Sequence, residues 1–169
     1  MWSIPPSKSL SVENFDGRRK VMALSMKGTY KHNIDTKGRL IIPAKLRDSL
    51  GQSFVVTMGV DECLYFYSND EWEIFTQRLD SQSNSKEEVR LIKRFFRSNA
   101  ADVEMDSQGR VIIPQDLRDS IGITKEVVVV GAGEKAELWP RDVWDKNQSD
   151  PALSRENIKK LLENMDIDF

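Results

Sequence analysis

The chain has 169 residues, the length of one compact domain or two small ones. Apolar residues make up 39% and charged residues 31%, as in globular proteins, and no apolar stretch approaches the roughly eighteen residues of a membrane span. A single cysteine, Cys63, excludes an intramolecular disulfide and any multi-cysteine metal site; a single histidine, His32, argues against a histidine metal site or a Ser–His pair. The 25 basic and 27 acidic residues give a net charge of −2, so no overall basic field indicates nucleic acid.

The first 26 residues have no clear apolar period and contain two adjacent prolines, so we predict a poorly ordered N-terminal extension over residues 1–26. Two arginines, Arg18 and Arg19, precede a short apolar stretch that ends at Lys27. This stretch is too short for an export signal. Together with the lone cysteine, it predicts a cytoplasmic protein.

The main internal feature is a tandem repeat. A shift of 71 residues aligns residues 35–51, DTKGRLIIPAKLRDSLG, with residues 106–122, DSQGRVIIPQDLRDSIG, and eleven of these seventeen positions are identical. The division that follows is a first repeat over 27–79, a connecting helical segment over 80–99, a second repeat over 100–146 and a C-terminal helical tail over 147–169.

Each repeat is predicted to have the order β-α-β-β, followed by a further helix. For the first repeat we expect a strand at Leu40–Ile42, a helix with Pro43 first and Gly51 just past its end, strands at Phe54–Met58 and Leu64–Tyr67, and a helix capped by Ser68 and Glu71. In the second repeat, Val127–Val130 is typical of a strand buried on both faces.

Two more helices are predicted outside the repeats. Ser85 and Glu88 are expected to cap a connecting helix whose apolar face carries Val89, Ile92, Phe95 and Phe96. The last helix, about Arg155–Met165, carries Ile158, Leu161 and Leu162. The fold class is therefore α+β. Each repeat is too thin to bury its own sheet, so we expect the two to pack together as a pseudo-twofold barrel with flanking helices.

Several single features have structural explanations. The G-x-G-x-x-A pattern at residues 131–136 lacks the following helix that a dinucleotide site requires, because Pro140 comes four residues later, and we interpret it as a hairpin turn. Cys63 is predicted to be a packed apolar side chain and His32 an ordinary polar contact. Trp72 and Trp144 occupy matching helical positions, so we expect them in the core.

The two D-x-x-G-R segments are the informative motif. Asp at the first position and Gly at the fourth are what a type I turn prefers. Turn chemistry does not explain the arginine, Arg39 in the first repeat and Arg110 in the second. It either forms a structural ion pair with the aspartate four residues earlier or presents a guanidinium to phosphate or to the O6/N7 edge of guanine.

Local charge distinguishes the two repeats. Residues 27–51 hold six basic and two acidic residues, a net charge of +4, whereas residues 98–122 hold two basic and five acidic residues, a net charge of −3. The acidic chain therefore contains one basic segment that a polyanion could use. The connecting helix adds four more basic residues, although a solvated face is the commoner meaning of such a run.

The order of these segments resembles the MraZ family of bacterial transcriptional regulators. Two D-x-x-G-R turns are each followed by an I-I-P segment, KGTYKHNID lies upstream, and RFFRSNAA lies between the copies. The similarity runs from about Met26 to Trp144. Family members begin near Met26, so the first 25 residues are additional or reflect a start codon assigned too far upstream; the aromatic residue usual after that methionine is absent.

This resemblance implies an AbrB-like swapped-hairpin barrel completed within one chain, and homo-oligomeric rings. It implies a nucleoid-associated repressor that binds short direct repeats of double-stranded DNA at the promoter of the division and cell-wall gene cluster, including its own gene. It also implies no cofactor and no enzymatic activity. The family's D-x-x-x-R signature falls on Asp35/Arg39 and Asp106/Arg110.

The leading hypothesis is a sequence-specific DNA-binding regulator. The predicted DNA-binding residues are Arg39 on a base edge, Lys37 beside it, Asp35, Thr36 and Gly38 in the turn, and Lys31, Lys45 and Arg47 on phosphates. The second-copy motif is Asp106, Gly109 and Arg110. We expect no catalytic residue, metal, small-molecule substrate or membrane partner. The alternatives are a protein-interaction module of the AbrB-like antitoxin type, with the 155–165 helix as its tail, and an enzyme on a barrel scaffold, against which the lack of a clustered acid, base or nucleophile argues.

Overall fold

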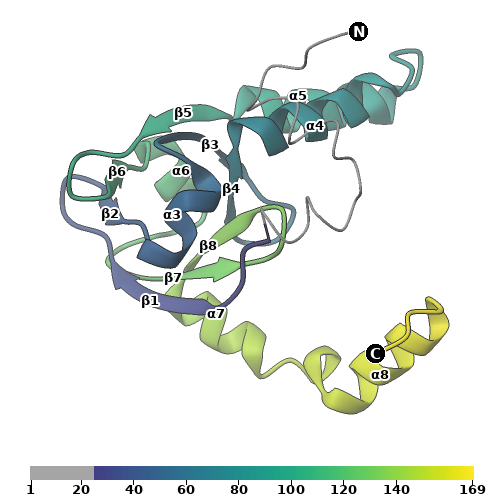
Figure 1. The fold of residues 1–169 in the computed structure, drawn as a ribbon. Helices are drawn as coiled ribbons and strands as arrows, with labels where there is room; N and C mark the ends of the chain where they lie inside the picture. The colour runs from purple at the N-terminus through teal and green to yellow at the C-terminus, as the bar shows by residue number, and fades with distance from the viewer. Residues whose placement is uncertain (1–24) are drawn as a thin grey trace, which may run out of the picture.

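The computed structural model describes residues 25–169, and Figure 1 shows their arrangement. The first repeat contains β1 (Thr29–Asn33), β2 (Arg39–Ile41), α3 (Ala44–Leu50), β3 (Ser53–Met58), β4 (Leu64–Ser68) and α4 (Asn69–Asp80), followed by α5 (Glu87–Ser98). The second contains β5 (Ala101–Glu104), β6 (Arg110–Ile112), α6 (Gln115–Ser120), β7 (Glu126–Gly131), β8 (Ala136–Pro140) and α7 (Arg141–Gln148), followed by the 3-10 turn η1 (Pro151–Leu153) and α8 (Arg155–Asn164). None of the helices in residues 25–169 is long and apolar enough to cross a membrane.

The strands of the two repeats are interleaved. Six of them form one antiparallel sheet in the order β1-β7-β8-β4-β3-β5, so the first strand of each repeat pairs with the third strand of the other. The remaining two, β2 and β6, pair only with each other. The order is the same when read from either end with the repeats exchanged, which is the pseudo-twofold barrel expected from the duplication. The α+β class is confirmed.

Interleaving is how two thin repeats bury a core. Leu40 of β2 lies opposite Val111 of β6, and both are at most 1% exposed. Behind this pair, Phe54 and Phe66 pack with ring centroids 5.3 Å apart, and neither is exposed. Because the inner cluster draws apolar side chains from both repeats, neither repeat has a complete core by itself.

A second apolar cluster lies on the outer face of the sheet, beneath α4, α5 and α7. Tyr67 stacks on Phe75 with centroids 5.3 Å apart, and Phe96 of α5 meets Phe75 edge-on at 4.9 Å. The predicted cap of α4 is confirmed, since the Ser68 hydroxyl accepts a hydrogen bond from the Glu71 backbone N–H at 3.2 Å. Trp72 and Trp144 pack partly buried against this cluster.

Cys63 belongs to the same outer cluster and is not exposed. Burial, with the carboxylates of Glu137 and Asp61 adding to it, raises the pKa of its thiol to about 12. At neutral pH it is therefore a protonated, packed side chain, as the sequence predicts.

The predicted β-α-β-β order of each repeat lacks one strand, because β1 in the first repeat and β5 in the second precede the D-x-x-G-R turn. Several boundaries also differ from the prediction. The strand after the first turn is Arg39–Ile41 and not Leu40–Ile42. Pro43 precedes α3 as its N-cap residue. The predicted cap of the connecting helix is wrong: α5 begins after Lys86 without a side-chain cap, because the Ser85 hydroxyl bonds to the Ser83 hydroxyl at 2.8 Å.

The start of the barrel lies one residue earlier than predicted. Residues 1–24 of the expected extension lie outside the described residues, but Met26, assigned to that extension, is 4% exposed and belongs to the inner core. Its backbone exchanges two hydrogen bonds of 2.8 Å with Gly133 in the β7–β8 hairpin, the turn predicted from the G-x-G-x-x-A pattern. At Gly131 a Cβ would overlap the backbone of Lys27, so only glycine permits this crossing.

These contacts predict where the chain can be shortened. A chain that begins at Met26 should keep the melting temperature of the full chain, whereas Met26→Ala should lower the free energy of unfolding by about 2–5 kcal/mol, as large-to-small changes in cores do. The measurements are thermal melts and urea unfolding followed by circular dichroism. Met165→Ala is the matched control, because Met165 is 68% exposed. Loss of the melting transition on starting at Met26 would contradict the prediction.

Candidate nucleic-acid interface

The first D-x-x-G-R turn is closed by hydrogen bonds to Asp35. One carboxylate oxygen, Oδ1, accepts the backbone N–H groups of Lys37 and Arg39, each at 2.9 Å. The other, Oδ2, accepts Nε of Arg39 at 2.6 Å. The backbone N–H of Gly38 closes the turn on the Asp35 carbonyl at 2.9 Å, and Gly38 has a positive φ of 79°.

The second turn repeats this geometry. Asp106 Oδ1 accepts the backbone N–H groups of Gln108 and Arg110 at 2.9 Å, and Oδ2 accepts Arg110 Nε at 2.8 Å. Hydrogen bonds from the backbone and side chain of the arginine, the backbone bond first, hold the pKa of each aspartate below its ordinary value. Both aspartates are therefore ionised at neutral pH and act as fixed acceptors.

The ion pair and an outward-facing guanidinium are compatible. Of the three guanidinium nitrogens of each arginine, only Nε donates a hydrogen bond to the aspartate. Within the described residues, the terminal Nη groups of Arg39 and Arg110 make no hydrogen bond. In each arginine, the two Nη groups form the fork that can bind a phosphate or the O6/N7 edge of guanine. The structural interpretation of the arginine is confirmed by this ion pair, which fixes the orientation of each guanidinium and leaves its Nη groups without a hydrogen bond among the described residues.

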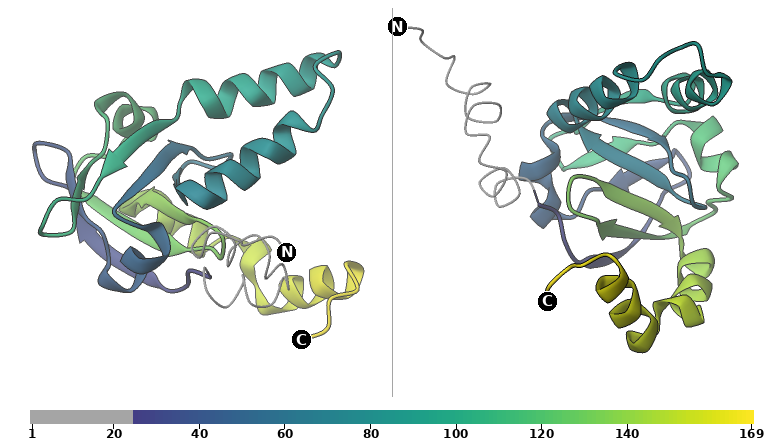
Figure 2. Two further views of the ribbon diagram at one scale, coloured as in Figure 1. Left: turned by 45° about the horizontal axis from the view of Figure 1, so that its top comes forward. Right: turned by 90° about the vertical axis from the view of Figure 1, so that its right-hand side faces the viewer.

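The two turns lie side by side at one end of the barrel, on the β2–β6 ribbon (Figure 1; Figure 2). In the ladder, Arg39 is opposite Ile112, and Ile41 is opposite Arg110. Between them, Leu40 and Val111 point into the core. Because side chains alternate along a strand, the outward face carries two arginines and two isoleucines. Ile41 is 46% and Ile112 61% exposed, an unusual position for large apolar side chains.

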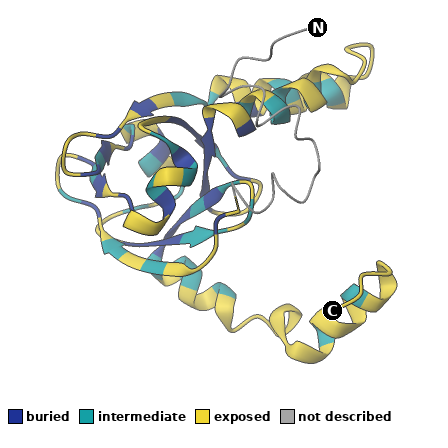
Figure 3. Cartoon of the chain, viewed as in Figure 1, coloured by how far each residue is buried: buried dark blue, intermediate teal, exposed yellow. Residues whose placement is uncertain are grey.

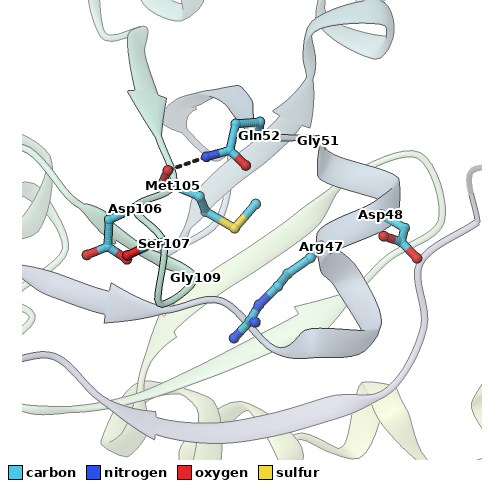
Figure 4. Close-up of a pocket in the computed structure, with 8 residues that line it drawn as sticks. All are labelled: Arg47, Asp48, Gly51, Gln52, Met105, Asp106, Ser107 and Gly109. Carbon is cyan, nitrogen blue, oxygen red and sulfur yellow. Dashed lines mark hydrogen bonds between the residues drawn. The ribbon is translucent and has the colours of Figure 1, made fainter.

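Each turn is supported by an arginine from the other repeat. Arg47 of α3 donates Nε to the Ile42 carbonyl at 2.9 Å and lies against Gly109, where a Cβ would overlap its guanidinium (Figure 4). Arg118 of α6 likewise donates to the Ile113 carbonyl at 3.0 Å and lies against Gly38. Backbone hydrogen bonds also connect each repeat to the turn of the other.

Two backbone hydrogen bonds connect the repeats at the turns. Ile42 N–H donates to the Gly109 carbonyl, and Ile113 N–H donates to the Gly38 carbonyl, both at 2.9 Å. The turns are thereby fixed to the ribbon from both sides. Beside the second turn, Gln52 and Met105 exchange bonds between their repeats in the same way, as the dashed line in Figure 4 marks for the Gln52 side chain.

This crossing changes the predicted site. Lys37 and Thr36 are exposed in the first turn beside Arg39, and Lys31 is exposed on β1. Arg47, by contrast, is brought to the second turn and not to Arg39, and Lys45 lies on the same helix. The net charge of a continuous segment is therefore not the charge around its turn. Arg47 also lies near His32, where burial first and Arg47 second lower the pKa of the imidazole.

Sequence reasoning missed Arg118, Ile41 and Ile112. A signal was present for Arg118, since Arg47 and Arg118 are among the eleven positions identical in both copies, whereas Lys37 and Lys45 are replaced by Gln108 and Asp116. The isoleucines gave no such signal, because an I-I pair after the turn does not show which member faces outward. Within residues 25–169, no group of three histidine, cysteine or acidic side chains could hold a metal ion.

Comparison with known proteins gives consistent matches. A family model described as "MraZ protein, putative antitoxin-like" matches the chain twice, over residues 26–95 and 96–165. A protein named Transcriptional regulator MraZ from Caldanaerobacter subterraneus is 41% identical over 140 residues, which cover 83% of this chain and 98% of that protein. One of the same name from Lachnoclostridium phytofermentans is 47% identical over 123 residues, 73% of this chain and 86% of that protein. With both repeats matched and the signature turns intact, the chain belongs to the MraZ family.

Proposed function

We propose that this protein is a DNA-binding transcriptional regulator that contacts base edges with the outward face of the β2–β6 ribbon. The observation that carries the proposal is the pair of aspartate-oriented guanidinium groups, Arg39 and Arg110, on one face of a two-stranded ribbon. The major groove of DNA is wide enough to admit such a ribbon. The names of the relatives, Transcriptional regulator MraZ, support the regulator over the antitoxin-type module.

The chemistry of the face suits base recognition. The Nη groups of an arginine can donate together to O6 and N7 of one guanine, the commonest specific contact in the major groove. Exposed Ile41 and Ile112 between the arginines can contact thymine methyl groups. Asp35 and Asp106 hold each arginine in one orientation before DNA arrives, which lowers the entropy lost on binding.

The basic residues around the ribbon suit the phosphate backbone. Lys37 and Thr36 at the first turn, Lys31 on β1, and Lys45 and Arg47 on α3 can hold phosphates on either side of the base contacts. Such contacts fix the register of a protein on DNA and carry no sequence information themselves. The turn glycines, Gly38 and Gly109, allow the close packing of Arg118 and Arg47 that supports this arrangement.

The target we propose is the promoter of the division and cell-wall gene cluster, where the protein represses transcription, including that of its own gene. The resemblance to the family supports this, together with short direct DNA repeats as the operator and a place in the cytoplasm at the nucleoid. The barrel, formed by residues 26–79 and 100–146, is the DNA-binding unit. No enzymatic step and no cofactor are part of the proposal.

Specific binding requires several linked barrels. One ribbon reaches only a few base pairs, and each good base contact contributes about 1–3 kcal/mol. Linking copies converts later contacts into intramolecular ones with a high effective concentration. A ring of subunits facing successive direct repeats meets this requirement.

The first prediction compares two arginines with a matched control. Arg39→Ala should weaken binding to the chain's own promoter DNA at least tenfold, since a bidentate contact to guanine contributes about 1–3 kcal/mol. Arg110→Ala should weaken it less, because the second turn has Gln108 in place of Lys37 to hold a neighbouring phosphate. Arg141→Ala is the control: Arg141 pairs with Asp145 four residues later at 3.0 Å, but lies on α7.

Binding is measured by fluorescence anisotropy, with thermal melts as the folding control. All three melting temperatures should stay near that of the wild type, since exposed ion pairs contribute little to stability. Wild-type affinity of Arg39→Ala would remove the proposed site. An affinity loss for Arg141→Ala equal to that for Arg39→Ala would show that the ribbon is not the contact surface.

The second prediction concerns salt. Lys37→Ala should weaken binding and reduce the slope of log affinity against log salt concentration by about one unit, because one fewer counterion is released. Lys146→Ala on α7 should leave the slope unchanged. An unchanged slope for Lys37→Ala would exclude a phosphate contact at the first turn.

The third prediction concerns assembly. Light scattering at micromolar concentration should give a mass above that of a dimer, because single ribbons bind too few base pairs to select a promoter. A monomer that binds the promoter with full specificity would contradict the proposed assembly while leaving the ribbon as the contact surface.

A further inference from the structure

Two helices occupy equivalent places in the duplication. The family model ends in α5 in its first match, at residue 95, and just past α8 in its second, at residue 165. Both helices carry large apolar side chains at positions i, i+3 and i+7. In α5 these are Val89, Ile92 and Phe96; in α8 they are Ile158, Leu161 and Met165. Each helix thus has one apolar stripe to bury.

The two stripes meet different surroundings. Helix α5 folds back on α4, where Phe96 is 8% exposed against Phe75, and Arg97 forms two hydrogen bonds with Asp80 at 2.9 and 2.8 Å. Helix α8 extends away from the barrel and packs against η1 rather than the sheet (Figure 1). Its stripe is uncovered: Leu161 is 46% and Met165 68% exposed, and α8 is exposed along its length (Figure 3).

The outer side of α5 also presents uncovered apolar side chains. Leu91 is 52% and Phe95 39% exposed, and they lie one helical turn apart beside Ile92. Most of the large exposed hydrophobic side chains in residues 25–169 belong to α5 or to the segment from Ile158 to Phe169. Monomeric proteins rarely leave such patches in water, so both surfaces need a partner.

The charges beside the two surfaces are complementary. Arg94 of α5 lies next to Phe95 and makes no hydrogen bond or ion pair with any described residue. Beyond α8, the last residues carry Asp166 and Asp168 between the exposed Met165, Ile167 and Phe169, and neither carboxylate has a partner among the described residues. Arg94 thus offers a cation to the acidic tail at the Phe95 end of this face, whereas Glu87 and Glu88 lie at the other end, one turn from Leu91.

The two surfaces belong to different helices. The α4–α5 pair covers β3 and β4, whereas α8 follows α7, which lies against β7 and β8. In Figure 1 and Figure 2, α5 lies at the top of the molecule and α8 at the bottom. A contact between α8 of one molecule and α5 of another joins two unlike surfaces, and such a heterologous contact closes into a ring when the rotation between neighbouring subunits allows it.

We propose that residues 155–169 of one molecule dock on the outer face of α5 of the next, with Ile158, Leu161 and Phe169 covering Leu91, Ile92 and Phe95, and with Asp166 or Asp168 pairing with Arg94. The second-repeat helix thereby covers a neighbour's helix instead of its own sheet. This inference rests on the proposed assembly and assigns the surfaces that make it.

The test is a charge exchange followed by light scattering on the full chain. Arg94→Asp alone, and Asp166→Arg with Asp168→Arg, should each shift the mass at micromolar concentration toward the monomer. Combining all three changes should restore the wild-type mass, because the pair is re-formed with reversed signs. Leu161→Glu should also give monomers, while Lys160→Glu on the opposite face of α8 should not. Melting of the barrel should be unaffected in every variant.

A cross-linking experiment tests the contact directly. Phe95→Cys and Leu161→Cys should form a covalent dimer on oxidation when the two variants are mixed, and neither should do so alone; Cys63 is buried and does not interfere. A chain starting at Met26 should assemble as the wild type does, and its failure would mean that the N-terminal residues cover α5. Wild-type mass in Leu161→Glu and Arg94→Asp would overturn this inference alone. A monomeric wild type would overturn it together with the proposed assembly, while loss of DNA binding in Arg39→Ala tests the ribbon independently.

Discussion

The structure depends on the pairing of β2 with β6. Each of these strands has only three residues, and neither forms a ladder with another of the described strands. Their pairing brings Leu40 and Val111 together beneath the surface and joins the two repeats at one end of the barrel. The polypeptide leaves this ribbon through Ile42 and Ile113, each of which donates a backbone hydrogen bond to the turn of the other repeat. A short ladder therefore sets both the core and the position of the two turns.

The same ladder gives the candidate site its rigidity. Asp35 and Asp106 are bound by backbone N–H groups within a tight turn, so each carboxylate has little freedom, and the arginine attached to it has little more. Arg47 and Arg118 lock the glycine side of each turn from the opposite repeat. Sites held within packed elements position their groups better than sites on long loops. The proposed recognition surface is thus built on the same strands that carry the hydrophobic core.

The sequence predicted most of the fold because the two copies of the repeat indicate the same elements independently. The repeat, the Ser68 cap, the helix before Gly51 and the valine strand all lie where local patterns indicate. The site was only partly predictable. Spacing identified Asp35 with Arg39, but the charge of the continuous segment counted Arg47 together with Arg39, whereas interleaving places Arg47 against Gly109 of the second turn. The exposed face of Ile41 could not be foreseen, since a three-residue strand offers too few alternations to fix its direction.

Joining both halves of the barrel in one polypeptide removes a constraint that identical subunits obey. A symmetric dimer must present the same turn twice, and so it suits a palindromic DNA sequence, in which the two half-sites are inverted. Here Lys37 of the first turn corresponds to Gln108 of the second, and Lys31 on β1 corresponds to Asp102 on β5. The two turns can diverge separately, so that the two ends of the proposed DNA-contacting ribbon need not be alike. A protein with two different contact turns suits DNA sequence elements that are repeated in the same orientation.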